Sequence, residues 1–141
     1  MSKSSLTFRD YIVEKVSFEI NLKYSGREVE VDMELDSSNE VDKDNFATIL
    51  ELDLFPDAVK NDYPFNMKVR LIGLFTMQSD EKEAVKESYI ERNSVSILFP
   101  YLRSIVSTYT ANSNVNTTVL PAINVIKYLE KKRKHKKIEE V

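Results

Sequence analysis

The segments Lys15-Val-Ser-Phe-Glu-Ile-Asn-Leu22 and Glu28-Val-Glu-Val-Asp-Met-Glu-Leu35 alternate apolar and polar side chains along their whole length. In the second segment every polar position is acidic. Strict alternation with one charged face is typical of an antiparallel strand that is buried on one side and wet on the other. Both segments are therefore predicted strands, and Ser25-Gly26 between them is a predicted turn.

Two further strands are predicted downstream, over 46–55 and 65–78, with the polar stretch 37–45 as a connection. Gly73 interrupts the fourth strand, and a glycine inside a strand indicates a bulge or a close backbone approach. Four strands are therefore expected before the first helix.

Helical patterns fill the second half of the chain. A helix is predicted to open at residues 79–83, and from about Ser94 apolar residues recur at helical spacing as far as Tyr109. Pro100 is expected to kink this helix, and Asn124 is expected to cap a last one.

Strands first and helices last predict an α+β domain: a four-stranded antiparallel sheet followed by two helices packed on one face. So small a sheet has exposed edges that must be covered or paired with another copy, so an oligomer is expected. We expect the domain to occupy residues 1–130 and residues 131–141 to form a mobile basic tail.

The composition argues against catalysis. The 141-residue chain has no cysteine, and its one histidine, His135, lies in a basic run. Thiolate nucleophiles, disulfides and cysteine-based zinc sites are therefore excluded, and the usual general base near pH 7 is missing from the predicted domain. Neither glycine has the neighbours of a phosphate-binding loop. The sequence predicts a protein that is not an enzyme and has no cofactor and no metal.

Partners and location follow from charge and hydropathy. The net charge of −3 argues against nucleic-acid binding through the overall field. The basic run Lys131–Lys137 leaves RNA or ribosome binding open as a minor alternative, although a solvated helix end is favoured. The N-terminus lacks the apolar core of a signal peptide and no apolar run spans a bilayer, so a cytoplasmic location is expected.

The segment Ile97-Leu-Phe-Pro-Tyr-Leu-Arg103 places a proline inside a helical pattern, at a cost of about 3 kcal/mol. Local stability alone would not select it. The segment resembles the helix-one signature of the SecB export chaperone family. Val16-Ser-Phe-Glu19, Gly73-Leu-Phe75 and Leu120-Pro-Ala-Ile-Asn-Val125 resemble further stretches of that family in the same order.

The resemblance implies an ATP-independent holdase that keeps unfolded polypeptides competent for export or folding. It also implies a homotetramer, a dimer of dimers in which the helices lie between two sheets. The signature and oligomer-interface positions are Phe99, Pro100, Tyr101, Arg103 and Val106. The expected client-binding groove is apolar, although about half of its predicted residues should prove to be core: Val29, Val31, Met33, Leu35, Val119, Leu120, Val125, Tyr128 and Leu129.

The resemblance implies that export members bind the SecA motor through acidic positions and one leucine, which aligns with Asn66, on the outer face of the sheet. The corresponding positions here are Lys15, Glu19, Asn66 and Lys68, which include two charge reversals. Weak or absent SecA binding is therefore expected. The identity of the client stays open between general export and one dedicated protein such as an antitoxin.

Overall fold

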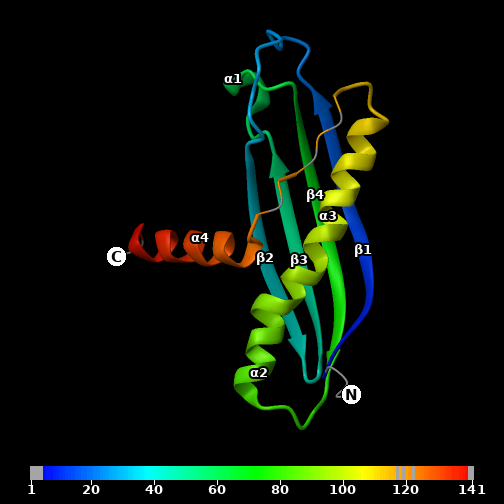
Figure 1. The fold of residues 1–141 in the computed structure, drawn as a ribbon, viewed down its shortest axis with the longest axis vertical. Helices are drawn as coiled ribbons and strands as arrows, with labels where there is room; N and C mark the ends of the chain where they lie inside the picture. Colours follow the sequence, from blue (N-terminus) through cyan, green and yellow to red (C-terminus); the bar gives the residue numbers. More distant parts are fainter. Residues whose placement is uncertain (1–4, 117, 119, 122, 140–141) are drawn as a thin grey trace.

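Four strands form one antiparallel sheet in the order β1–β4–β3–β2 (Figure 1). They are β1 (Leu6–Ile20), β2 (Met33–Asp42), β3 (Asn45–Leu54) and β4 (Phe65–Met77). The structure is a computed structural model that describes residues 5–139 except 117, 119 and 122, the last five by their backbone alone. The predicted α+β class, with four antiparallel strands and helices, is confirmed.

The boundaries of β1 and β2 differ from the predicted ones. β1 begins at Leu6, well before Lys15, and the predicted second strand over 28–35 is wrong in its first half, because residues 21–32 form a loop. The predicted connection over 37–45 is also wrong, because most of it belongs to β2. β2 pairs with β3 from Met33↔Leu54 to Asp42↔Asn45, so residues 28–32 of the predicted second strand have no strand opposite them. Polar residues are suited to β2 because it is an edge strand.

The inner face of the sheet carries the core. Along β4, alternate residues from Phe65 to Met77 are buried. The helices α2 (Glu83–Ser88), η1 (Tyr89–Asn93) and α3 (Ser94–Ala111) follow one another directly, and α3 crosses this inner face (Figure 1). Leu98, Leu102 and Val106 of α3 are fully buried against it.

Gly73 lies where Leu98 of α3 packs against the sheet. A Cβ atom at this position would lie 2.6 Å from Cδ2 and 2.7 Å from Cδ1 of Leu98. Gly73 pairs with Tyr11 of β1, and β1 shifts register on both sides, between Phe8 and Asp10 and between Val13 and Lys15. The predicted close backbone approach is therefore confirmed, and the irregularities lie in the partner strand.

The turn between α2 and α3 is π-helical. The Ser94 hydroxyl donates to the Ile90 carbonyl (2.8 Å) and accepts from the Thr48 hydroxyl (2.7 Å). The hydroxyls of Tyr89 and Ser5 lie 2.7 Å apart, within hydrogen-bond distance. Polar side chains from β3 and the N-terminus thus fix the position of the wide turn.

Two helices flank the sheet. α1 (Ala58–Asn61) is a single turn between β3 and β4, bounded by Asp57 and Asp62 in left-handed conformations. α4 (Val125–Glu139) begins beside β2 and projects sideways from the sheet (Figure 1). The backbone N–H of Lys127 donates to Oδ1 of Asn124 (3.0 Å), which confirms the predicted cap. No helix within the described residues is long and apolar enough to cross a membrane.

Candidate binding groove

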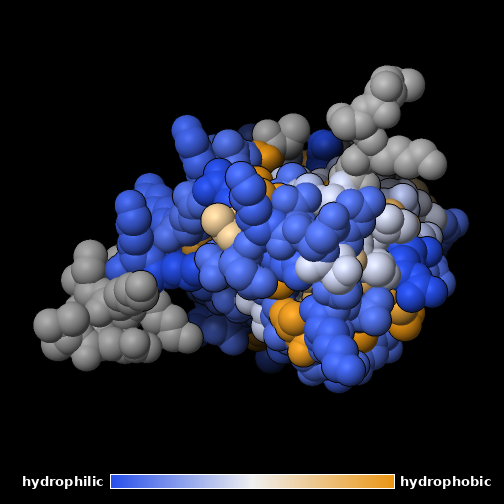
Figure 2. Space-filling model, turned by 90° about the horizontal axis from the view of Figure 1, so that it is seen from below, coloured by the Kyte–Doolittle hydropathy of each residue, from blue (hydrophilic) through white to orange (hydrophobic). Residues whose placement is uncertain are grey.

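A groove of about 560 Å³, lined by apolar and polar residues, lies between the loop 21–32 and the chain that connects α3 to α4. Its floor includes Phe55 and Phe65, and Val29, Val31 and Val115 line its walls. The loop lies at one end of the sheet and α2 at the other (Figure 1). Viewed from the α2 end, the surface is mostly hydrophilic, with small separate hydrophobic areas (Figure 2). The groove lies at the opposite end, beside the loop 21–32.

Polar contacts with α1 and the chain after it hold the loop wall in shape. The buried Asn21 amide donates to the Tyr63 carbonyl (3.0 Å) and the Ala58 carbonyl (3.3 Å). Farther along, the Tyr63 hydroxyl donates to the Asp32 carboxylate (2.6 Å). The loop is thus tied at both ends, so little ordering is needed when a ligand enters.

Asp62 ties the middle of the loop. Its carboxylate accepts from the backbone N–H of Ser25 (2.9 Å) and lies 3.3 Å from the Arg27 guanidinium. The hydrogen bond from the Ser25 hydroxyl, followed by the Ser25 backbone bond and the Arg27 charge, lowers the pKa of Asp62 below 3.8. The loop is therefore held by an ionised carboxylate at neutral pH.

The opposite wall depends on the signature helix. The guanidinium of Arg103 donates from Nε to the Leu120 carbonyl (3.0 Å). The backbone N–H of Thr118 donates to the Thr110 hydroxyl (2.9 Å). Leu120 itself is fully buried. Arg103 of the Ile97–Arg103 segment thus fixes the connecting chain against α3.

The predicted client-binding residues fall into three groups. Val29 is half-buried and Val31 is 38% exposed, and both line the groove. Met33, the first residue of β2, and Tyr128 of α4, which contacts β2, are half-buried. The remaining described residues are buried in the core: Leu35, Leu120, Val125 and Leu129. Val119 lies outside the described residues.

The structure adds lining residues that the sequence patterns did not single out, above all Phe55, Phe65 and Val115. Phe55 and Phe65 are nearly fully buried and contact each other edge to face at 5.2 Å between ring centroids. Their only sequence signal is a position next to Pro56 and Pro64, where the strands end. Apolar pattern alone does not separate such a floor from ordinary core.

The signature positions divide between core and surface. Phe99 and Val106 are buried, whereas Pro100 is exposed. The Tyr101 ring contacts Tyr11 of β1, with 4.7 Å between centroids. An exposed apolar strip thus follows β1 and the adjoining side of α3: Tyr11, Val13, Tyr101 and Tyr109.

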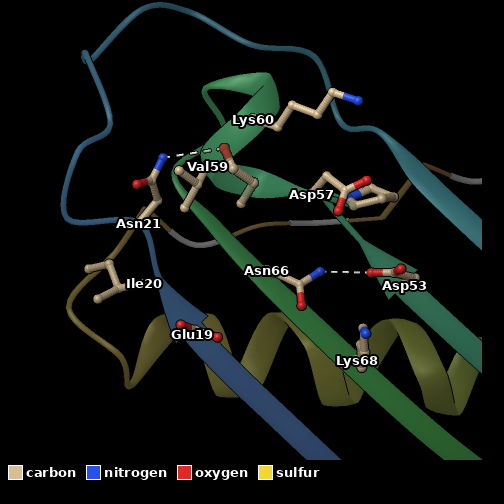
Figure 3. Close-up of a pocket in the computed structure, with 11 residues that line it drawn as sticks. Glu19, Ile20, Asn21, Asp53, Asp57, Val59, Lys60, Asn66 and Lys68 are labelled. Atoms are coloured by element: carbon tan, nitrogen blue, oxygen red, sulfur yellow. Dashed lines mark hydrogen bonds between the residues drawn. The ribbon is translucent and has the colours of Figure 1, made fainter.

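The four predicted motor-docking residues lie on β1 and β4. Glu19 pairs with Asn66, Lys15 pairs with Arg70, and Lys68 pairs with Ser17. Opposite residues of an antiparallel pair share a face, and this one is the outer face, because the alternate residues of β4 are buried. Figure 3 shows Glu19, Asn66 and Lys68 beside an open pocket of about 500 Å³ that α1 also lines.

Lys15 lies in the neighbouring pocket with Lys68 and Arg70. Arg70 makes ion pairs with Glu14 (2.6 Å) and Glu51. The outer face therefore carries mixed charge around the two lysines.

Among the side chains that the structure describes, no group of three His, Cys, Asp or Glu residues is arranged to hold a metal ion.

One family profile matches most of the chain. The profile of the family described as "Preprotein translocase subunit SecB" matches residues 3–136. An uncharacterised protein of Methanocaldococcus jannaschii, MJ0357, is 32% identical over 130 residues, covering 87% of this chain and 81% of that protein.

Solved structures share the fold. The Mycobacterium tuberculosis Rv1957 SecB-like chaperone, in complex with a ChAD peptide from the Rv1956 HigA1 antitoxin, has a TM-score of 0.67 at 16% identity. The match covers 84% of this chain and 88% of that one. A protein of unknown function from Streptococcus agalactiae has a TM-score of 0.51 at 10% identity, covering 85% and 99% of the two chains.

Proposed function

Because this chain belongs to the SecB family, a family of chaperones rather than enzymes, we propose that it is an ATP-independent holdase for unfolded polypeptides. The observation that carries the proposal is the groove, in which Val29 and Val31 stand above a floor of Phe55 and Phe65. A groove with these apolar residues in it and with walls fixed by hydrogen bonds is suited to capturing apolar side chains of an extended chain, while its polar residues can bond the client backbone. The Rv1957 structure, with its bound antitoxin peptide, supports a polypeptide as the ligand.

The binding energy would come from burial of client side chains. Each large apolar side chain contributes about 1.5–3 kcal/mol when it is fully buried, from which the ordering of the client must be subtracted. Glu28 lies at the groove, and its negative charge favours clients with basic residues beside the apolar ones. Such contacts select apolar and basic character without selecting a sequence.

An oligomer would multiply the grooves. β1 is an edge strand, and the exposed strip of Tyr11, Val13, Tyr101 and Tyr109 lies along it. Exposed edges and contiguous apolar patches both favour association. We infer a dimer through this edge and a homotetramer from two such dimers, so that several grooves hold one client with avidity. The mass measured by light scattering after size exclusion tests this, and a stable monomer would exclude it.

The client is a separate question. The outer face presents Lys15 and Lys68 where export members have acidic groups, and Arg70 lies beside them. The two lysines weaken the attraction of this mixed-charge face for a basic partner, because like charges at an interface are unfavourable. We propose weak or absent coupling to SecA and a dedicated client, such as an antitoxin, as the alternative to general export. Calorimetry against SecA of the same cell decides between them: submicromolar binding that Glu19→Ala abolishes would restore the export role.

The holdase function is tested by light scattering of a refolding client at a stoichiometric ratio, without ATP. The wild type should delay aggregation, and Val31→Asp should abolish the delay because a buried charge is costly. Val59→Asp is the matched control, since Val59 is 68% exposed and lies outside the groove. Circular dichroism should show both variants folded.

Two outcomes contradict the proposal at different levels. Aggregation that the wild type does not delay would remove the holdase function. Equal activity of the folded Val31→Asp and Val59→Asp variants would remove this groove as the site. Met33→Asp separates a further case: because Met33 is half-buried, loss of folding would assign it to the core.

A further inference from the structure

Charge is divided unequally between α4 and the rest of the chain. α4 contains seven lysine and arginine residues and two glutamates, which give it a net charge of +5. Because the whole chain carries −3, the remainder carries −8. Six of the seven cations lie in the stretch Lys131–Lys137, which we call the basic half of α4. The protein is therefore a net-acidic domain with one basic helix.

The basic half of α4 projects away from the sheet (Figure 1). The helix is tied to β2 before and at the start of this half: the Tyr128 hydroxyl accepts from the Leu35 N–H (3.2 Å), and Lys132 pairs with Asp36 (2.8 Å). Lys134 is exposed and lies six residues beyond Tyr128, or about 9 Å along the helix axis. Because the Debye length is about 8 Å at physiological ionic strength, the outer part of the basic half is screened from the acidic sheet.

The cations of the basic half do not stabilise the helix itself. The helix dipole favours cations only within the last turn, whereas residues 131–137 make almost two turns. Lys132 and Lys136 are four positions apart, as are Arg133 and Lys137, and like charges at this spacing destabilise a helix. An anionic partner would remove this repulsion.

The composition and geometry of the basic half identify the kind of partner. The stretch 131–137 has no apolar residue, so it lacks the face with which a helix enters a lipid interface. Its positions lie on all sides of the helix, because residues 131–137 make almost two turns, whereas a folded acidic protein would contact one side. Five of its six cations are lysines, which bind phosphates as point charges. A long polyanion of phosphates therefore fits this helix.

Charge density and width point to duplex DNA. The six cations are distributed over about 10 Å of helix axis, or one per about 1.7 Å, and duplex DNA carries one negative charge per about 1.7 Å. An α-helix with its side chains is about 10–12 Å wide, which fits the B-DNA major groove of about 12 Å. The major groove of duplex RNA is deep and narrow and does not admit such a helix.

We propose that the basic half of α4 is a sequence-independent binding element for duplex DNA, which lies in the major groove and contacts the phosphates on both sides of it. The element shares no residue with the groove between the loop 21–32 and the chain after α3, so it acts independently of client binding. Because the rest of the protein is net acidic, only this helix attracts the duplex, and the affinity depends strongly on salt.

Fluorescence anisotropy tests the proposal with a labelled, mixed-sequence DNA duplex of about 20 base pairs, or two helical turns. The affinity is measured as the salt concentration rises from about 50 to 200 mM. If four to six phosphates are neutralised, the slope of log K against log[salt] is about −4 to −5, and the affinity should fall about 10²–10³-fold. A failure to bind at about 50 mM salt, or a slope near zero, would overturn the proposal.

A pair of double variants separates the helix from the overall charge. Lys131→Gln with Lys134→Gln removes two exposed cations from the basic half. This variant should make the slope shallower by about 2 and weaken binding at least about tenfold at low salt. Lys43→Gln with Lys60→Gln is the matched control, because it removes the same charge from exposed positions outside α4, and its affinity should stay within about twofold of the wild type. Equal effects of the two variants would refute the assignment to α4.

Competitors and the aggregation assay distinguish DNA from other partners. Duplex RNA of the same sequence should bind at least about fivefold more weakly, and polyglutamate at equal charge should not displace the DNA. Equal binding of RNA, or displacement by polyglutamate, would exclude duplex DNA as the partner. The Lys131→Gln, Lys134→Gln variant should delay client aggregation as the wild type does, and loss of that delay would assign the lysines to clients and contradict the proposal. A wild type that binds DNA without delaying aggregation would remove the holdase function and support this separate one.

Discussion

Replacement of Gly73 by alanine tests how closely α3 contacts the sheet. Gly73 has an ordinary extended backbone, so the effect of a methyl group comes from contact and not from φ. That methyl would meet both terminal methyl groups of Leu98 at 2.6 and 2.7 Å, below any stable carbon–carbon contact, and Leu98 is fully buried.

The expected change in the free energy of unfolding follows from two opposing effects of Gly73→Ala. Overpacking a core costs about 1–3 kcal/mol, whereas replacing glycine stabilises by about 0.4–1 kcal/mol through the unfolded chain. Gly73→Ala should therefore lower the free energy of unfolding by about 1–2 kcal/mol. Leu98→Ala should lower it by about 2–5 kcal/mol because it leaves a cavity.

The double variant is the decisive measurement. Leu98→Ala removes the two contacts with Leu98 and leaves only the contact with Cε2 of Phe75 at 2.8 Å. The two single losses should therefore sum to more than the double variant loses, by about 0.5–3 kcal/mol. Urea unfolding at one fixed protein concentration measures all four species. Gly73→Ala combined with Leu102→Ala is the control and should be additive. Additivity with Leu98→Ala would refute the reasoning.

Three further predictions concern the signature helix and the loop. Phe99→Ala should lower the free energy of unfolding by about 3–5 kcal/mol in urea titration, because the ring is 5% exposed; a loss under 1 kcal/mol would contradict its burial. Arg103→Ala should speed amide exchange of Leu120 without changing exchange in β3, because it removes the bond to the Leu120 carbonyl. The lowered pKa of Asp62 stabilises the loop fully above the unfolded value of 3.8, and this stabilisation is lost as the pH falls below it. Exchange of the Ser25 amide should therefore accelerate below about pH 4, relative to the intrinsic rate, and Asp62→Asn should remove the step.

Sequence patterns predicted the regular central strands better than the edges. β3 and β4 carry clean alternation, and their predicted ends agree to within one residue. β1 contains two register shifts, each of which reverses the parity of the alternation, so its first half shows no sustained period. β2 begins at Met33 because Met33 pairs with Leu54, the last residue of β3. The start of β2 therefore depends on both segments, and the pattern of one segment cannot predict it.

The candidate site was predictable in type but not in detail. Val31 and Leu35 occupy equivalent positions of one alternating pattern, yet Val31 is 38% exposed in the groove and Leu35 is fully buried. The difference arises because the chain leaves the sheet before Met33. A specific local motif succeeded where periodicity did not, since Ile97–Arg103 led to the family. Tyr128 and Lys132 of α4 bond the backbone of Leu35 in β2, and no local pattern encodes such contacts between distant residues.

The π-helical turn at Tyr89–Asn93 has a consequence for evolution by insertion and deletion. A π turn holds about one residue more than an α turn, and each residue rotates a helix by about 100°. A relative that lacks one residue here would keep α3 on the sheet but turn α2 away, so that Lys86 would leave Asp44. Single-residue gaps at this turn should therefore occur in homologues together with replacement of Lys86, Asp44 or Ser5, and not alone.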